Sequence, residues 1–124
     1  MPAAKVAKER MSERLVTAGK IKTRAWSAWN NKMPPPPDDV HVIGEVYVSN
    51  PGVEPRLRLH QPQGINKTIL LLDLYLYQKP GIWPQVFVWA KTRYDAIAKP
   101  SRYKQAQIIF GGATIATMPV KDVF

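Results

Sequence analysis

The stretch "LLLDLYLYQKPGIWPQVFVWA", residues 70–90, most constrains how this chain can fold. Apolar side chains fill both sets of alternating positions in two strand-like runs, and a Pro-Gly turn separates the runs. A strand with one face in water should alternate between apolar and polar residues. The pattern therefore predicts that the core covers one face of these strands and that another group covers the second face.

The rest of residues 40–124 alternates between short apolar runs and turns rich in Gly or Pro. Period-two alternation and these turns predict six strands, with Pro119 ending the last of them. The strands are expected over residues 40–48, 53–60, 68–78, 85–94, 103–110 and 113–118, with a seventh, short edge strand possible after Pro119. Short strands of this number form sandwiches or small barrels. We expect an all-β fold, a small antiparallel β-sandwich of six to seven strands.

The two-residue period of a strand assigns each side chain of residues 69–77 to one of two faces. The core face is expected to hold the even-numbered leucines, which are Leu70, Leu72, Leu74 and Leu76. Asp73 lies on the second face among large apolar residues. A buried unpaired charge is costly, so we expect Asp73 to pair with Arg58 or Lys91.

The N-terminal third of the chain carries most of the positive charge. Residues 1–33 hold eight Lys or Arg and two Glu, whereas the other 91 residues hold ten basic and seven acidic groups. Apolar residues at steps of three and four predict helices over residues 4–18 and 21–29. Four consecutive prolines favour a stiff linker. The sequence predicts a basic helical arm at 1–33, a proline-rich linker at 34–39 and a β-sandwich domain at 40–124.

Composition limits the chemistry available to the chain. A net charge of +9 and a pI near 10.0 favour a polyanion or an acidic surface as partner. The chain has no cysteine, which excludes disulfides and thiolate sites and fits a cytoplasmic protein. No apolar run is long enough for a membrane span. Two histidines without metal-ligand spacing give no candidate catalytic, cofactor or metal site, so we expect a protein that is not an enzyme.

Two hypotheses for the function follow. The first is an interaction or structural protein that buries its arm and an aromatic sheet face in a protein partner or a homo-oligomer. Its expected contact residues are Trp26, Trp29, Ile69, Leu71, Tyr75, Tyr77, Phe87 and Trp89. The alternative is an accessory nucleic-acid-binding protein that uses the basic arm and a sheet face where Arg and Lys lie beside the aromatic residues. Its expected phosphate contacts are Arg56, Arg58, Lys91 and Arg93.

Overall fold

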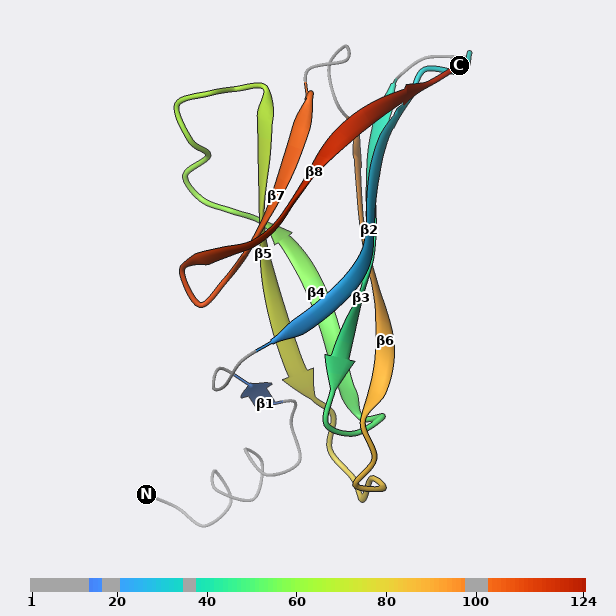
Figure 1. Cartoon of the computed structure of the whole chain (residues 1–124), viewed down its shortest axis with the longest axis vertical. Helices are drawn as coiled ribbons and strands as arrows, with labels where there is room; N and C mark the ends of the chain where they lie inside the picture. Colours follow the sequence, from blue (N-terminus) through green and yellow to red (C-terminus); the bar gives the residue numbers. More distant parts are fainter. Residues whose placement is uncertain (1–13, 17–20, 35–37, 98–102) are drawn as a thin grey trace, which may run out of the picture.

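The computed structural model describes residues 14–16, 21–34, 38–97 and 103–124, in which every regular element is a β-strand (Figure 1). The strands are β1 (Arg14–Val16), β2 (Lys22–Asn31), β3 (Asp39–Val48), β4 (Val53–Leu59), β5 (Ile69–Gln78), β6 (Val88–Ile97), β7 (Gln105–Phe110) and β8 (Ala113–Val123). The predicted all-β class is confirmed. Five of the six strands expected in residues 40–118 begin and end within a few residues of their predicted bounds. The sixth, expected to end before Pro119, continues to Val123.

The strands form one mixed sheet that is nearly barrel-shaped, in the order β1-β5-β7-β8-β2-β3-β6, with β4 also paired to β5. The predicted antiparallel sandwich is wrong in two respects. The sheet is continuous because β8 pairs first with β7 and then with β2. Two of its ladders, β5–β7 and β2–β8, are parallel. Proline is tolerated at strand irregularities, and Pro119 lies where β8 leaves β7 for β2.

β4, which pairs with β5 outside this order, lies beside β6, the last strand of the order, and no backbone ladder joins the two strands. The hydroxyl of the buried Thr92 on β6 donates a hydrogen bond to the carbonyl oxygen of Pro55 on β4, at 3.1 Å. This contact nearly closes the sheet, so the outer faces of β4 and β6 adjoin.

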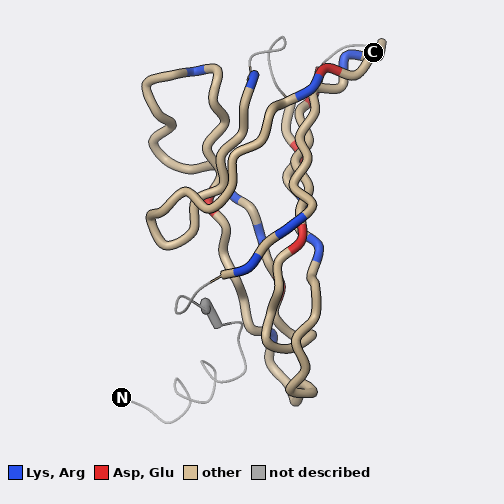
Figure 2. The backbone as a smooth tube through the Cα atoms, in the orientation of Figure 1, with Lys and Arg blue, Asp and Glu red and all other residues tan. Residues whose placement is uncertain are grey.

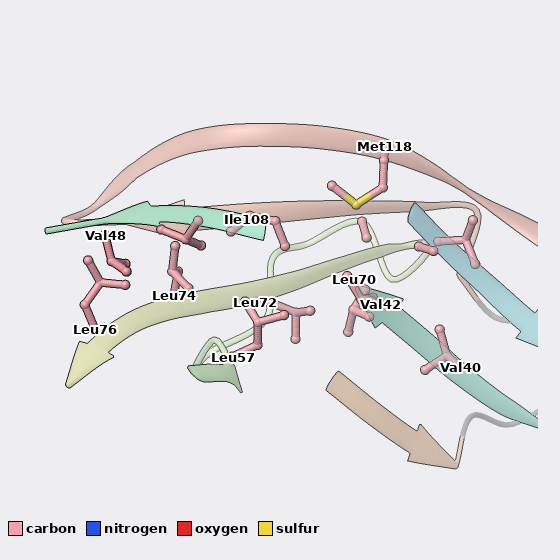
Figure 3. Packing of buried hydrophobic residues seen from close by; sticks show 14 of the residues in the cluster. Val40, Val42, Val48, Leu57, Leu70, Leu72, Leu74, Leu76, Ile108 and Met118 are labelled. Atoms are coloured by element: carbon pink, nitrogen blue, oxygen red, sulfur yellow. The ribbon is translucent and has the colours of Figure 1, made fainter. Parts of the chain in front are cut away.

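The core lies inside the curled sheet, where side chains from all the longer strands meet (Figure 3). The predicted inner face of β5 is confirmed. The most deeply buried apolar side chains include Val40, Val42, Val46, Leu70, Leu72, Leu74 and Ile108. Burying each such side chain contributes about 1.5–3 kcal/mol, so the alternation of β3 and β5 accounts for much of the stability of the fold.

The helix expected for residues 21–29 is wrong, because this segment is strand β2 in the same sheet as residues 40–124. A β-bulge shifts the register of β2 against β3 between Arg24 and Ser27. The extra residue breaks the period-two alternation, so the apolar spacing of β2 resembles that of a helix. Of the helix expected for residues 4–18, only residues 14–16 are described, and they form strand β1. The remainder of that helix lies outside the described residues.

The proline-rich segment connects neighbouring strands. β2 and β3 pair antiparallel up to Asn31 opposite Asp39, so the chain between them joins the two strands of a hairpin. Residues 35–37 lie outside the described part of the chain. The segment therefore does not hold β2 at a distance from the sheet, as a spacer would.

The bulge turns Trp26 toward the core. Ala25 at the bulge has a φ of 58°, a left-handed conformation that is uncommon for a residue with a Cβ. The ring of Trp26 packs against the core cluster and lies over the backbone of Gly44 on β3. A Cβ at Gly44 would overlap the six-membered ring of this indole. Glycine at position 44 is therefore what allows Trp26 to pack inside the sheet.

We expect Gly44→Ala to lower the free energy of unfolding by about 1–3 kcal/mol, because the new methyl group forces the Trp26 ring from its place. Urea denaturation measures the loss, and a red shift of the tryptophan emission would report the displaced ring. Gly64→Ala is the matched control, since its methyl group would meet only one atom, Leu71 Cδ1, at 3.4 Å. Equal stabilities for the two variants would contradict the packing of Trp26 over Gly44.

Candidate contact surface

The outward side chains at one end of β2, β3 and β6 form a continuous surface, here called the contact strip. The register of the ladders brings these side chains together. Lys22 of β2 is opposite Tyr47 of β3, which is opposite Trp89 of β6. In the next outward row, Glu45 of β3 lies between Arg24 of β2 and Lys91 of β6. The contact strip consists of Lys22, Arg24, Ile43, Glu45, Tyr47, Phe87, Trp89, Lys91 and Arg93.

Three aromatic rings occupy one end of the contact strip. Tyr47 stacks on Phe87 with a centroid distance of 5.2 Å and an interplanar angle of 23°. The centroid of Trp89 lies 4.9 Å from that of Tyr47, on the other side of the cluster. Phe87 is 58% exposed and Tyr47 is 37% exposed. These rings therefore present apolar area to solvent.

Cations adjoin these rings. The Arg24 guanidinium carbon lies 3.9 Å from the Trp89 ring centroid, and Lys22 Nζ lies 5.5 Å from that of Tyr47. Arg24 Nε also donates to Glu45 Oε1 at 2.7 Å. Figure 2 shows basic positions of β2 and β6 on either side of an acidic position of β3. The strip carries four basic side chains and one acidic side chain, and no described carboxylate forms a salt bridge with Lys22 or Lys91.

A groove of about 410 Å³ continues the strip beyond the aromatic end. It is lined by Ala25, Ile43, Gly44, Glu45, Lys91, Thr92 and Arg93. The bulge opens this groove, because it places the small Ala25 at its wall while the large Trp26 packs inside. A space of this volume is within the range of ligand pockets.

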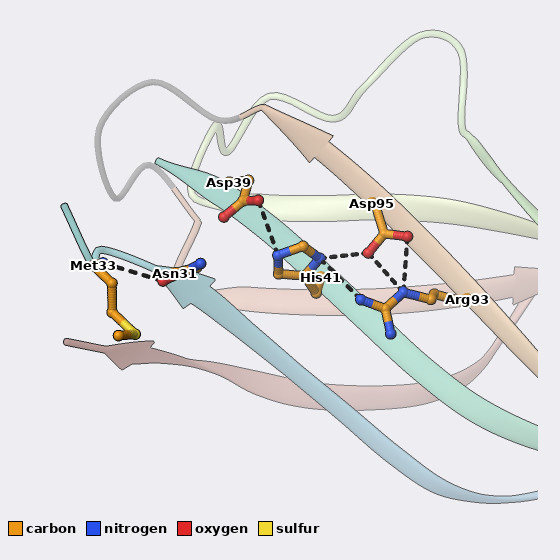
Figure 4. Close-up of polar contacts among 6 residues, drawn as sticks. All are labelled: Asn31, Met33, Asp39, His41, Arg93 and Asp95. Carbon is orange, nitrogen blue, oxygen red and sulfur yellow. Dashed lines mark hydrogen bonds and ion pairs between the residues drawn. The ribbon is translucent and has the colours of Figure 1, made fainter. Parts of the chain in front are cut away.

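The far end of the same strands is acidic (Figure 4). His41 Nε2 lies 3.1 Å from Asp39 Oδ2, and His41 Nδ1 contacts Asp95. Arg93 Nε donates to Asp95 Oδ2 at 2.8 Å. Burial raises the pKa of Asp95, but hydrogen bonds from Arg93 and His41 lower this pKa by more, so it lies below its ordinary value. Both ring nitrogens of His41 are engaged, and the two carboxylates disfavour a polyanion at this end.

A second group of cations and rings covers the outer face of β4 and β5. The Arg56 guanidinium carbon lies 4.4 Å from the Tyr77 centroid, and that of Arg58 lies 5.5 Å from the Tyr75 centroid. Both tyrosines are half-buried. Arginine side chains of the same molecule therefore cover much of the face that was expected to be open.

Asp73 has a different partner from the one expected. His60 Nδ1 lies 2.8 Å from Asp73 Oδ1. Arg58 is opposite Asp73 in the ladder, but its guanidinium lies near the tyrosine rings, and Lys91 is on β6, which does not pair with β5. The histidine lies within reach because His60 directly follows β4 and continues alongside β5, where its backbone N donates to Leu71 O at 3.0 Å.

The loop between β4 and β5 covers another part of this face. The Gln63 side chain accepts a hydrogen bond from Leu71 N at 3.0 Å and donates to Leu71 O at 2.8 Å. A methyl group at Gly64 would contact Leu71 Cδ1 at 3.4 Å. Ile69 lies beside this loop, in a pocket of about 310 Å³ with Lys67 and Tyr103. The second face of β5 is therefore covered largely by the chain itself.

The structure brings together only part of the residues expected to contact a partner. Phe87 and Trp89 lie in the contact strip, whereas Ile69, Leu71, Tyr75 and Tyr77 lie on the outer face of β5, and Trp26 packs on the core. Trp29 lies farther along β2, with its ring centroid 5.2 Å from that of His41. The expected cations divide in the same way, Arg56 and Arg58 on β4 and Lys91 and Arg93 on β6.

Sequence reasoning missed Lys22, Arg24 and Tyr47 as members of the site. The alternation of Lys22, Thr23 and Arg24 at the start of β2 was the available signal, but it was assigned to a helix. Tyr47 was not assigned to either face of its strand from the sequence. Its partners became visible only with the register of β3 against β6.

The described residues contain no group of three or more His, Asp or Glu arranged to hold a metal ion. Within the same residues no helix is long and apolar enough to cross a membrane. No protein-family model, no curated protein and no solved structure matches the chain.

Proposed function

We propose that this protein is a non-enzymatic nucleic-acid-binding protein that holds single strands along the contact strip. The observation that carries this proposal is the exposed cluster of Tyr47, Phe87 and Trp89 with Lys22 and Arg24 against its rings. Proteins that bind single strands use aromatic rings to stack on bases and cations to hold the phosphates. Both groups lie within one short stretch of sheet.

The partial exposure of the aromatic rings supports a ligand at this place. Tyr75 and Tyr77 also lie near arginines, but they are half-buried and already packed. Phe87, in contrast, leaves more than half of its surface in water. An exposed apolar patch with a polar rim is typical of a contact site, so we choose the contact strip over the face of β4 and β5.

Charge favours a polyanion over an apolar protein surface. The chain has a net charge of +9, and the strip has four basic side chains against one acidic side chain. The first hypothesis required an arm and a broad aromatic face that a protein partner buries. With Trp26 on the core and Leu71 under the β4–β5 loop, fewer apolar residues remain for such an interface. We therefore rank a protein partner or homo-oligomer second.

Fluorescence anisotropy with a labelled single-stranded oligonucleotide of about 16 nucleotides, near the upper end of known site sizes, tests the proposal. We expect binding at low salt and a log affinity that falls linearly with log salt concentration. We also expect the single strand to bind more tightly than a duplex of the same sequence, because duplex bases cannot stack on the rings.

Absence of binding at low salt, or an equal preference for the duplex, would overturn the proposal. Light scattering on the same samples addresses the first hypothesis. Self-association that persists at high salt and is lost in Phe87→Ala would support an apolar protein interface in place of a nucleic-acid site.

A further inference from the structure

We infer that the groove beside the β2 bulge is a base-reading subsite, in which Glu45 selects bases that carry an exocyclic amine. This inference rests on the proposed function and adds a preference among sequences to it. Three observations carry it: the shape of the groove, the position of one carboxylate among cations, and the distance from the groove to the aromatic cluster.

The groove exists because the strand departs locally from regular pairing. Ala25 adopts a φ of 58°, and the register shift at this point directs Trp26 to the core. A non-glycine residue in this conformation is strained, and such strain is often found at functional sites. Bulges also occur beside binding sites, where they redirect side chains. The resulting space of about 410 Å³ lies directly above β3.

Glu45 supplies the acceptor in this groove. Its Oε1 accepts a hydrogen bond from Arg24 Nε at 2.7 Å, which fixes the carboxylate. A carboxylate has about four lone-pair sites, so acceptor capacity remains for a ligand. Cytosine presents an exocyclic amine, which donates a hydrogen bond to a carboxylate, whereas thymine presents a carbonyl oxygen at the same position. Glu45 therefore favours cytosine and disfavours thymine.

The cations of the groove fit the phosphates on either side of such a base. Lys91 and Arg93 are exposed residues on β6 that line the groove. Asp95 orients Arg93 through the bond from Arg93 Nε to Asp95 Oδ2 at 2.8 Å. Trp89 lies two residues before Lys91 on the same outer face, a separation of about 7 Å along the strand. A neighbouring base can therefore stack at the aromatic end while one base occupies the groove.

Anisotropy with oligo-dC and oligo-dT of equal length at pH 7.5 tests the subsite. We expect the wild-type protein to bind oligo-dC at least about fivefold more tightly, since one good base contact discriminates by about this factor or more. Glu45→Gln should bring the ratio of the two affinities close to one, because an amide both donates and accepts. Glu54→Gln on β4 is the matched control, since Glu54 pairs with Lys79 outside the groove.

The outcomes separate the two proposals. If neither oligonucleotide binds, the proposed function fails. If both bind the wild-type protein equally, single-strand binding stands and the base-reading subsite is overturned. A preference for oligo-dC that Glu45→Gln leaves unchanged, in a variant with wild-type thermal stability, would also overturn the assignment to Glu45. The assignment to Glu45 is supported if Glu45→Gln loses the preference for oligo-dC over oligo-dT and Glu54→Gln keeps it.

Discussion

Leu74→Ala is expected to lower the free energy of unfolding by about 2–5 kcal/mol. Leu74 is 2% exposed on the inner face of β5, within the main core cluster. Removing its side chain loses apolar burial and leaves a cavity that the closely packed strands cannot fill. Trp89→Ala should cost less, about 1–2 kcal/mol, because Trp89 lies on the outer face and loses mainly its contacts with Tyr47 and Arg24. Urea denaturation followed by circular dichroism gives both values.

The comparison separates the core from the contact surface. If Trp89→Ala destabilises the protein as severely as Leu74→Ala, Trp89 serves the packing of the fold. The contact strip would then lose one of its three aromatic rings as a ligand contact. The two-residue period of β6 assigns Trp89 to the face opposite Val88, which packs against the core.

The double variant Phe87→Ala/Trp89→Ala is expected to weaken binding of a single strand at least about 30-fold. Stacking of one base on an aromatic side chain contributes about 1–3 kcal/mol, and this variant removes both rings contributed by the β6 side of the cluster. Anisotropy at constant salt measures the loss, with circular dichroism as a check that the variant remains folded.

Phe124→Ala is the matched control for this loss. Phe124 is 82% exposed, and Lys32 Nζ lies 5.4 Å from its ring centroid, so it also forms an exposed pair of a ring and a cation. It lies at the opposite end of the molecule from the β5–β6 loop (Figure 1). A similar loss of affinity in both variants would mean that exposed rings act nonspecifically and that the contact strip has no special role.

Local patterns predicted most of the strands and faces. Alternation identified the inner residues of β5, and Gly111 and Gly112 have the positive φ angles, 59° and 83°, that suit the expected two-residue hairpin turn. Parallel pairing between β5 and β7, or between β8 and β2, leaves no such local pattern. These contacts join distant segments, so the sequence predicted the strands but not the sheet that they form.

The candidate site was harder to predict because it depends on that sheet. Reading β2 as a helix removed Lys22 and Arg24 from the outer face, and one bulge was enough to cause this error. The partner of Asp73 was missed because His60, directly after β4, is diagonal to Asp73 across the β4–β5 pair, and this register was not known from the sequence. In contrast, Phe87 and Trp89 were predicted to share one face, and both rings contact Tyr47. Residues two apart on an extended segment share a face whichever strands lie beside it.

The most direct test of the central proposal compares two pairs of lysines for their effect on the salt dependence of single-strand binding. Lys22→Gln/Lys91→Gln removes two cations of the contact strip. Lys104→Gln/Lys121→Gln removes two exposed cations outside it, directly before β7 and near the end of β8, and these strand ends lie opposite the β5–β6 loop in Figure 1. Each phosphate contact to a single strand contributes about 0.7 to the slope of log affinity against log salt. We expect the first pair to reduce this slope by about 1.4 and the second pair to leave it unchanged. Equal reductions by both pairs, or none by the first pair, would contradict a nucleic-acid site on the contact strip.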